Sequence, residues 1–364
     1  MGLEEQEGLK IGGIPHGTRN LITDVPGVRV GNRTLAHGDV QTGVTVVLPH
    51  PGDLFHDKVM AASHVINGFG KSTGLVQINE LGTLESPIVL TNTLSVGTAY
   101  TAVVRELLRI NPDIGDTTGT VNPVVCECND GYLNDIRALS VTEADVLSAW
   151  KNCAEDFQEG SVGAGRGMSC HQLKGGIGSS SRLVTLDGKM FVVGALVLTN
   201  FGRLQDLVIG HDPAGPRIAS WLQSHEPQLR KELATQRDAG SVITLIATDV
   251  PLSERQLQRV AKRAAVGLSR TGSYVSNGSG EIAIAFSTAN PVPHYAKTEI
   301  LPFRMVDDNA IDVVFRATAD AVHEAVLSSL LHATTVEGRS GHVRWALGDI
   351  LAKTEEKEAG EHDR

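Results

Sequence analysis

The interpretation of this sequence turns on one stretch, Asp238-Ala239-Gly240-Ser241-Val242-Ile243-Thr244-Leu245-Ile246-Ala247-Thr248. From Ser241 onward it is almost entirely apolar or β-branched, a composition that predicts a buried strand. A charged segment, 230–238, runs directly into that strand and is typical of a turn. Gly240 stands between the two, and its missing Cβ allows the chain to bend without steric hindrance.

The Gly240-Ser241 junction has the residue types that self-cleavage requires. A hydroxyl must attack the preceding carbonyl, and a rigid strand must then hold the new terminus. Once free, an α-amine with an ordinary pKa of about 7.7–8.0 can take the proton of its own hydroxyl. Ser241 is therefore a candidate N-terminal nucleophile. Taken alone, the pattern fits equally an ordinary strand after a glycine turn, since Gly-Ser pairs occur elsewhere in the chain.

The rest of the chain alternates short β-branched runs with amphipathic helical stretches, which predicts a layered α/β fold. Further strands are predicted over 43–48, 88–90, 182–186, 191–198 and 281–286, with a hairpin turn at Asp187-Gly188. Capping boxes predict one helix from Thr142 to about Phe157 and another that begins after Ser253, and a third helix is predicted over 317–330. With no repeat or linker, we expect one domain and a frayed charged tail over 353–364.

Composition and charge exclude several classes of function. The net charge of −10, without a Lys/Arg-rich block, argues against a nucleic-acid partner. The longest apolar run, 191–198, is too short to span a membrane. The beginning of the chain, 1–13, has no apolar core, so no secretory signal is expected there. Four cysteines make no disulfide framework for 364 residues, and we expect a cytoplasmic location.

Neither a metal nor a cofactor is expected. Cys126-Glu127-Cys128 lacks a second pair of ligands for zinc, and the sequence has no HExxH motif. The glycine-rich segment 163–178 could be mistaken for a phosphate cradle. Its glycines, however, form neither a P-loop nor G-x-G-x-x-G. Close backbone packing is the better interpretation of these glycines.

Five ordered blocks give the sequence a family resemblance. They are Leu21–Gly31 (LITDVPGVRVG), Thr42–Pro49 (TGVTVVLP), Gly163–Met168 (GAGRGM) with Lys174–Arg182 (KGGIGSSSR), Gly240-Ser241, and Asn277–Glu281 (NGSGE). Together they resemble the S58-type L-aminopeptidase/D-esterase (D-Ala-esterase/amidase) and β-aminopeptidase family, whose members are self-processing hydrolases with an N-terminal nucleophile. The resemblance runs from Leu21 to about Gly348. Arg166 and His171 stand where smaller or aromatic residues are expected, which puts substrate preference in question.

The resemblance implies roles for four residues. Ser241 forms an acyl-enzyme with the substrate, and Ser279 and Glu281 match the family's pair beside the nucleophile. A spacing of two puts both side chains on one face of a strand, where the carboxylate can hold the α-ammonium or hydroxyl of Ser241. Asn200, at the end of a predicted strand, resembles the oxyanion-hole asparagine. The alternatives are a solvated strand face for the pair, and a strand-ending turn for Asn200.

The resemblance also implies a substrate-facing loop that contains Glu127 and Tyr132. An aminopeptidase needs an anion for the substrate's amino terminus. Glu127 is the candidate for it, and Asp130 is its rival. Tyr132 could contact the scissile bond. Asn129-Asp130-Gly131 is also an ordinary turn signal.

The fold implied by the resemblance is a four-layer αββα sandwich. Self-cleavage would give an α-chain of 1–240 and a β-chain of 241–364 that stay associated, and relatives are usually homo-oligomers. The implied function is release of N-terminal residues from short peptides, amino-acid amides or β-peptides. The alternatives are an amino-acid acyltransferase of related fold and a non-catalytic binding relative. L-, D- and β-amino-acid substrates and nylon-type oligomers stay open.

Overall fold

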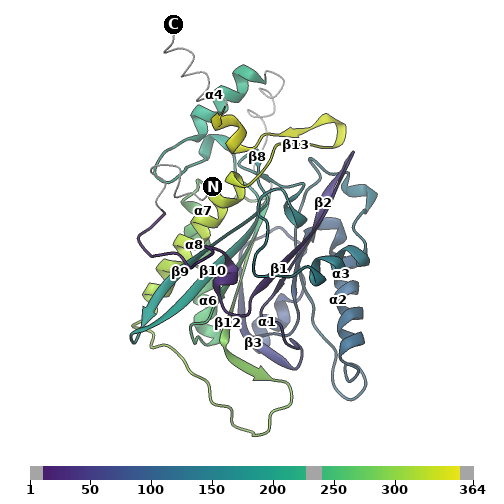
Figure 1. Ribbon diagram of the computed structural model, residues 1–364, viewed down its shortest axis with the longest axis vertical. Coiled ribbons are helices and arrows are strands. Elements are labelled where there is room, and N and C mark those ends of the chain that lie inside the picture. The colour runs from purple at the N-terminus through teal and green to yellow at the C-terminus, as the bar shows by residue number, and fades with distance from the viewer. Residues whose placement is uncertain (1–10, 227–239, 353–364) are drawn as a thin grey trace.

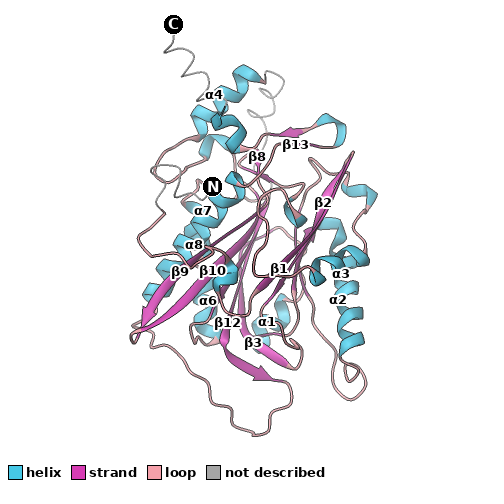
Figure 2. Cartoon of the chain, in the orientation of Figure 1, coloured by secondary structure: helices cyan, strands magenta, loops and turns pink. Residues whose placement is uncertain are grey.

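In the computed structural model, residues 11–226 and 240–352 are described (Figure 1). Two β-sheets pack face to face, and helices cover both outer faces (Figures 1 and 2). The predicted αββα sandwich is confirmed. The predicted charged turn before Gly240, except for that residue itself, and the predicted frayed tail 353–364 lie outside the described residues.

The first sheet has four strands in the order β1-β2-β5-β6. Their bounds are β1 Arg29–His37, β2 Val40–Leu48, β5 Ile88–Asn92 and β6 Val124–Cys128. Helices α2 (Val96–Ile110) and α3 (Glu143–Lys151) pack on its outer face. An apolar cluster that includes Val46, Val89 and Val103 fills the space between this sheet and these helices.

The second sheet has six strands in the order β4-β3-β12-β11-β10-β9. Their bounds are β3 Asp57–Gly68, β4 Thr83–Leu84, β9 Ile177–Leu186, β10 Lys189–Asn200, β11 Ser241–Thr248 and β12 Gly280–Pro293. On its outer face lie α6 (Glu254–Ala261), α7 (Ala264–Ser269) and the long α8 (Asp312–Leu331). The remaining elements are α1 Leu75–Leu81, α4 Gly215–His225, and the short hairpin strands β7 Ser169–Cys170, β8 Leu173–Lys174, β13 Val336–Glu337 and β14 Val343–Arg344.

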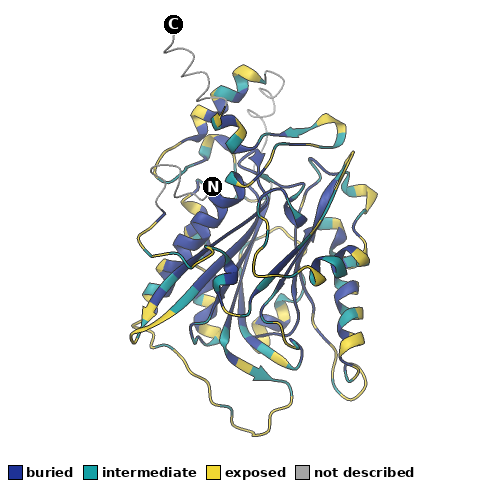
Figure 3. Ribbon diagram, viewed as in Figure 1, coloured by how far each residue is buried: buried dark blue, intermediate teal, exposed yellow. Residues whose placement is uncertain are grey.

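Strand β11 lies in the middle of the second sheet and is buried along its whole length (Figure 3). Its side chains alternate between the two faces of the sheet. Ile243 and Leu245 enter the apolar core between the sheets, whereas Val242 and Ile246 enter the core under the helices. Ser241 shares the parity of Ile243, so its side chain belongs to the face between the sheets.

The local sequence signals largely predict the elements that form. Both predicted capping boxes are present, and Asp187 and Gly188 have φ of 48° and 70° in the turn between β9 and β10. The first capped helix ends at Lys151, earlier than the predicted end near Phe157, because Ala154 pairs instead with Val30 of β1. The segment after the second capping box, at Ser253, forms two helices, α6 and α7, separated by a turn.

Among the described residues, no helix is both long and apolar enough to cross a membrane.

Candidate active site

The first residue of β11 brings the predicted catalytic residues together. In the strand register, Ser241 lies opposite Asn200 of β10 on one side and opposite Gly280 of β12 on the other. Gly280 separates Ser279 from Glu281. Residues from three separate segments of the sequence therefore meet at the same end of three neighbouring strands.

The Gly240-Ser241 bond is held in a defined geometry. The Ser241 hydroxyl donates a hydrogen bond to the Gly240 carbonyl oxygen at 2.8 Å, and the Gly280 N–H donates to the same oxygen at 3.1 Å. A Cβ at position 240 would lie 1.9 Å from the Asn200 carbonyl oxygen, so only glycine fits there. The hydroxyl is thus adjacent to a carbonyl that a backbone donor already polarises.

Ser279 and Glu281 are both completely buried. The Ser279 hydroxyl donates a hydrogen bond to Glu281 Oε1, so the two side chains do point together. The Asn67 side chain holds the preceding loop by donating to the carbonyls of Ser276 and Ser279. The alternative of a solvated strand face is therefore wrong for this pair.

Asn200 is the last residue of β10 and is only 9% exposed. Its Oδ1 accepts a hydrogen bond from the Ser169 N–H at 2.9 Å, which fixes the orientation of the amide. Its Nδ2 donates to the Asn129 carbonyl, also at 2.9 Å. Because a primary amide carries two N–H groups, this bond leaves a second donor for developing negative charge.

Glu127 is buried near the end of β6, in the facing sheet. Its Oε1 accepts a hydrogen bond from the Lys71 N–H at 2.9 Å, and its Oε2 accepts one from the Thr93 hydroxyl. The segment that carries Phe69 and Lys71 also passes close to Gly280. A Cβ built on Gly280 would lie 2.5 Å from the Phe69 carbonyl oxygen and 3.1 Å from the Ser241 hydroxyl oxygen. One loop thus joins Glu127 to the Ser241 region.

Tyr132 is enclosed by the hairpin of β13 and β14. Its ring stacks on His342 with centroids 4.6 Å apart, and the Arg344 guanidinium lies 3.5 Å from the ring centroid. Arg344 Nε also donates to the Ser169 hydroxyl at 3.1 Å, and Ser169 in turn orients Asn200. The sequence analysis missed Ser169, His342 and Arg344, because no local signal connects residues this far apart in the chain.

Lys174, in the glycine-rich block, is another residue whose place the sequence did not reveal. It is completely buried, and its ammonium donates to the carbonyls of Gly165, Met168 and Gly175 at 2.7–2.9 Å. Burial lowers its pKa well below the ordinary value. Close backbone packing of the glycines is confirmed: a Cβ at Gly178 would lie 2.0 Å from a carbonyl oxygen of α8.

The two departures from the family pattern differ in their surroundings. The half-buried Arg166 donates from Nε to the Gln41 side chain at 2.7 Å. His171 is completely buried against Phe201, with its Nδ1 3.1 Å from the Arg203 carbonyl oxygen. Arg166 is therefore the more accessible of the two.

Asp130, the rival of Glu127, is completely buried, and burial raises the pKa of its carboxyl to about 7. A folded-state pKa above the unfolded value of 3.8 means that the folded chain binds this proton more tightly. Its contribution to the free energy of unfolding is complete below pH 4 and is lost as the pH rises through about 7.

Asp130→Asn is a neutral replacement of the same shape. We therefore expect the free energy of unfolding of this variant to fall less between pH 4 and 7 than that of the wild type. Urea unfolding of the wild type and the variant at several pH values measures this. Equal pH slopes for the two proteins would contradict the assignment.

Comparison with known proteins identifies the family. The sequence profile of peptidase family S58 matches residues 20–344. The chain belongs to this family. It is 37% identical over 349 residues to the β-peptidyl aminopeptidase BapA of Sphingosinicella microcystinivorans, covering 92% of this chain and 87% of that protein.

Solved structures agree with this assignment. A protein from Pyrococcus horikoshii OT3 superposes with a TM-score of 0.89 at 50% identity, over 99% of each chain. The L-aminopeptidase D-Ala-esterase/amidase of Ochrobactrum anthropi, described as a variant of the Ntn-hydrolase fold, superposes with a TM-score of 0.85 at 36% identity, over 97% of each chain. The S58 chain is thus a hydrolase acting on peptide bonds. Neither the acyltransferase nor the non-catalytic alternative gains support from these relatives.

Within the part of the chain that the structure describes, no group of three His, Cys, Asp or Glu side chains is arranged to hold a metal ion.

Proposed function

We propose that this S58 chain is a self-cleaving serine aminopeptidase that acts through an acyl-enzyme on Ser241. The observation that carries the proposal is the Gly240-Ser241 junction. There, a hydroxyl lies against the carbonyl that precedes it, glycine alone fits, and the Gly280 N–H donates to the carbonyl oxygen. Asn200 lies opposite Ser241 in the strand register, and Ser279 and Glu281 flank Gly280, the register partner of Ser241 on the other side.

This arrangement supports a self-cleavage reaction. Ser241 Oγ attacks the Gly240 carbonyl carbon, and the Gly280 N–H stabilises the negative charge that develops on the oxygen. The proton that Oγ loses passes to the amide nitrogen as the C–N bond breaks, which leaves Gly240 as an ester on Oγ and frees the α-amine of Ser241. Water hydrolyses the ester, giving an α-chain of 1–240 and a β-chain of 241–364.

In turnover, the freed α-amine of Ser241 takes the proton from Oγ, which attacks the substrate carbonyl. The second N–H of Asn200 faces the developing oxyanion. The leaving amine takes the proton back, and water resolves the acyl-enzyme. Glu281, held by Ser279, stabilises the α-ammonium form of Ser241 by a charge-assisted hydrogen bond.

Substrate selection rests on Glu127 and Tyr132. Glu127 supplies the negative charge for the substrate's amino terminus, and Tyr132, fixed by His342 and Arg344, lines the scissile region. The substrates we propose are short peptides, amino-acid amides and β-peptides, in keeping with the activities named for the relatives. Esterase activity, a cytoplasmic location and a homo-oligomeric state stay predictions.

Hydrolysis of p-nitroanilides of L-, D- and β-amino acids, with and without an N-acetyl group, tests this function. We expect the free-amine forms to be cleaved and the acetylated forms to be cleaved at least about tenfold more slowly, because the amine–carboxylate contact is lost. Glu127→Gln should raise KM for free-amine substrates by about tenfold or more.

Glu85→Gln is the matched control, because Glu85 is a similarly buried glutamate whose partners are Lys58 and Asn122. Equal cleavage of acetylated and free substrates would rule out an aminopeptidase. An increase in KM with Asp130→Asn, but not with Glu127→Gln, would instead assign the amine contact to Asp130.

A further inference from the structure

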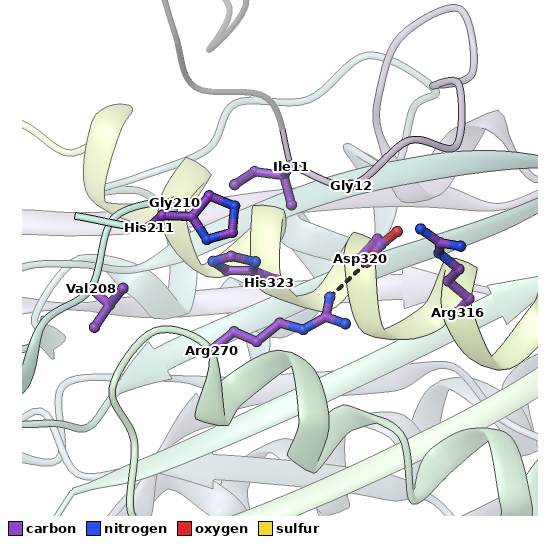
Figure 4. Close-up of a pocket in the computed structure, with 9 residues that line it drawn as sticks. All are labelled: Ile11, Gly12, Val208, Gly210, His211, Arg270, Arg316, Asp320 and His323. Atoms are coloured by element: carbon purple, nitrogen blue, oxygen red, sulfur yellow. Dashed lines mark hydrogen bonds and ion pairs between the residues drawn. The ribbon is translucent and has the colours of Figure 1, made fainter. Parts of the chain in front are cut away.

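A pocket of about 500 Å³ lies among helices α7 and α8, the loop after β10 and the first described residues (Figure 4). It is lined by Ile11, Gly12, Val208, Gly210, His211, Arg270, Arg316, Asp320 and His323. It shares no residue with the proposed active site, and its volume is within the range of sites for small molecules.

One face of α8 carries the polar part of the pocket. Arg316, Asp320 and His323 are separated by four and three positions, so they project from the same side of the helix (Figure 4). Arg270, just after α7, donates from Nη1 to Asp320 Oδ1 at 2.6 Å. Gly12 lies against the other carboxylate oxygen, since a Cβ there would be 2.3 Å from Asp320 Oδ2.

Within the described part of the chain, two buried polar atoms of this face have no hydrogen-bond partner. Asp320 is 2% exposed and His323 is 5% exposed, and neither Asp320 Oδ2 nor His323 Nε2 has a hydrogen-bond partner among the described residues. A buried polar atom that stays unsatisfied destabilises the folded state, because it has lost its hydrogen bonds to water without replacement. Both residues line the cavity, so each unsatisfied atom belongs to a side chain of its wall.

The charges of the pocket define the ligand. Arg270 is paired with Asp320, whereas Arg316 is exposed and makes no ion pair within the described ranges. Two guanidinium groups against one carboxylate leave a positive excess in a chain whose net charge is −10. That excess attracts an anionic group. The unsatisfied carboxylate oxygen of Asp320, in contrast, accepts a donor and disfavours a phosphate dianion.

We propose that this pocket binds a free amino acid as the zwitterion. Its carboxylate pairs with Arg316, its ammonium pairs with the Asp320 carboxylate, and its side chain contacts Ile11 and Val208. An arginine recognises a carboxylate by two parallel hydrogen bonds, and a carboxylate oxygen is the natural acceptor for an ammonium group. The site is independent of the proposed chemistry at Ser241, although a peptide hydrolase releases ligands of this class.

Calorimetric titration of the wild-type protein with four probes tests the pocket. The probes are L-alanine, propionate, ethylamine and inorganic phosphate; none contains a bond that a peptidase cleaves. We expect L-alanine to bind at least about tenfold more tightly than propionate or ethylamine, because each of these lacks one of the two charged contacts. Arg316→Gln should weaken L-alanine binding at least about tenfold.

Arg105→Gln is the matched control, since Arg105 is an exposed arginine on α2, in the opposite helical layer. This variant should bind L-alanine as tightly as the wild type does. Ser241→Ala should also retain binding, which separates this pocket from the active site. Arg316 is exposed, so a thermal melt of Arg316→Gln should match the wild type. Unchanged L-alanine binding in Arg316→Gln, tighter binding of phosphate, or no binding of any probe would each overturn the proposal.

Discussion

Ser241→Ala is expected to leave the chain uncut at 38.7 kDa and to lower kcat/KM by at least about 10⁴-fold. The hydroxyl is the only atom removed, and it is the group placed 2.8 Å from the Gly240 carbonyl oxygen. Without the hydroxyl the Gly240-Ser241 peptide bond stays intact, so the α-amine is not released and the nucleophilic oxygen is absent. Intact mass spectrometry, with p-nitroanilide hydrolysis on the same samples, measures both losses.

Ser287→Ala is a matched control for this change. Ser287 is a buried serine in β12, opposite the far end of β11, and its hydroxyl donates to the Val250 carbonyl at 2.7 Å. This variant should split at Gly240 and stay active. Ser241→Cys keeps a nucleophile in place and should still cleave itself. A wild-type chain that is active without being cut would exclude the N-terminal-nucleophile mechanism.

The central strand and its neighbours could be predicted because their signals are local. A run of apolar residues after Gly240 marks β11. A hydroxyl residue with a carboxylate or amide residue three positions later marks each capped helix. The four-layer arrangement came from the ordered blocks of the family resemblance. Ser279 and Glu281 could be paired because a spacing of two acts within one short segment.

Contacts between distant segments could not be predicted in the same way. Arg344 reaches Ser169 across 175 positions, and only the folded hairpin of β13 and β14 brings its guanidinium over Tyr132. The polar face of α8 has the same origin. In the sequence, nothing distinguishes Asp320 from a solvent-exposed acid on a helix. Its burial and its unsatisfied oxygen depend on Gly12 and Arg270, which pack around it only in the folded chain.

The role of Asn200 can be separated from self-cleavage because the two steps use different donors. In the uncut chain, the carbonyl that Ser241 attacks receives its hydrogen bond from the Gly280 N–H. The Asn200 amide is oriented elsewhere, by the Ser169 N–H and the Asn129 carbonyl. Loss of the amide donor should therefore leave processing intact and slow only the later reaction on substrate.

We accordingly expect Asn200→Asp to split into two chains but to lose about 10²–10³-fold in kcat, with KM little changed. Aspartate retains the acceptor for Ser169 but removes both amide protons. Asn290→Asp is the control, because Asn290 is also buried and its amide likewise accepts from a backbone N–H and donates to a backbone carbonyl, both of Arg304. If Asn200→Asp instead blocks cleavage at Gly240, the amide stabilises the self-cleavage step, and the assignment of that oxyanion to Gly280 is wrong. If both processing and kcat are unchanged, Asn200 is only a strand-ending residue, since a donor aimed at the transition state cannot be removed without slowing the reaction.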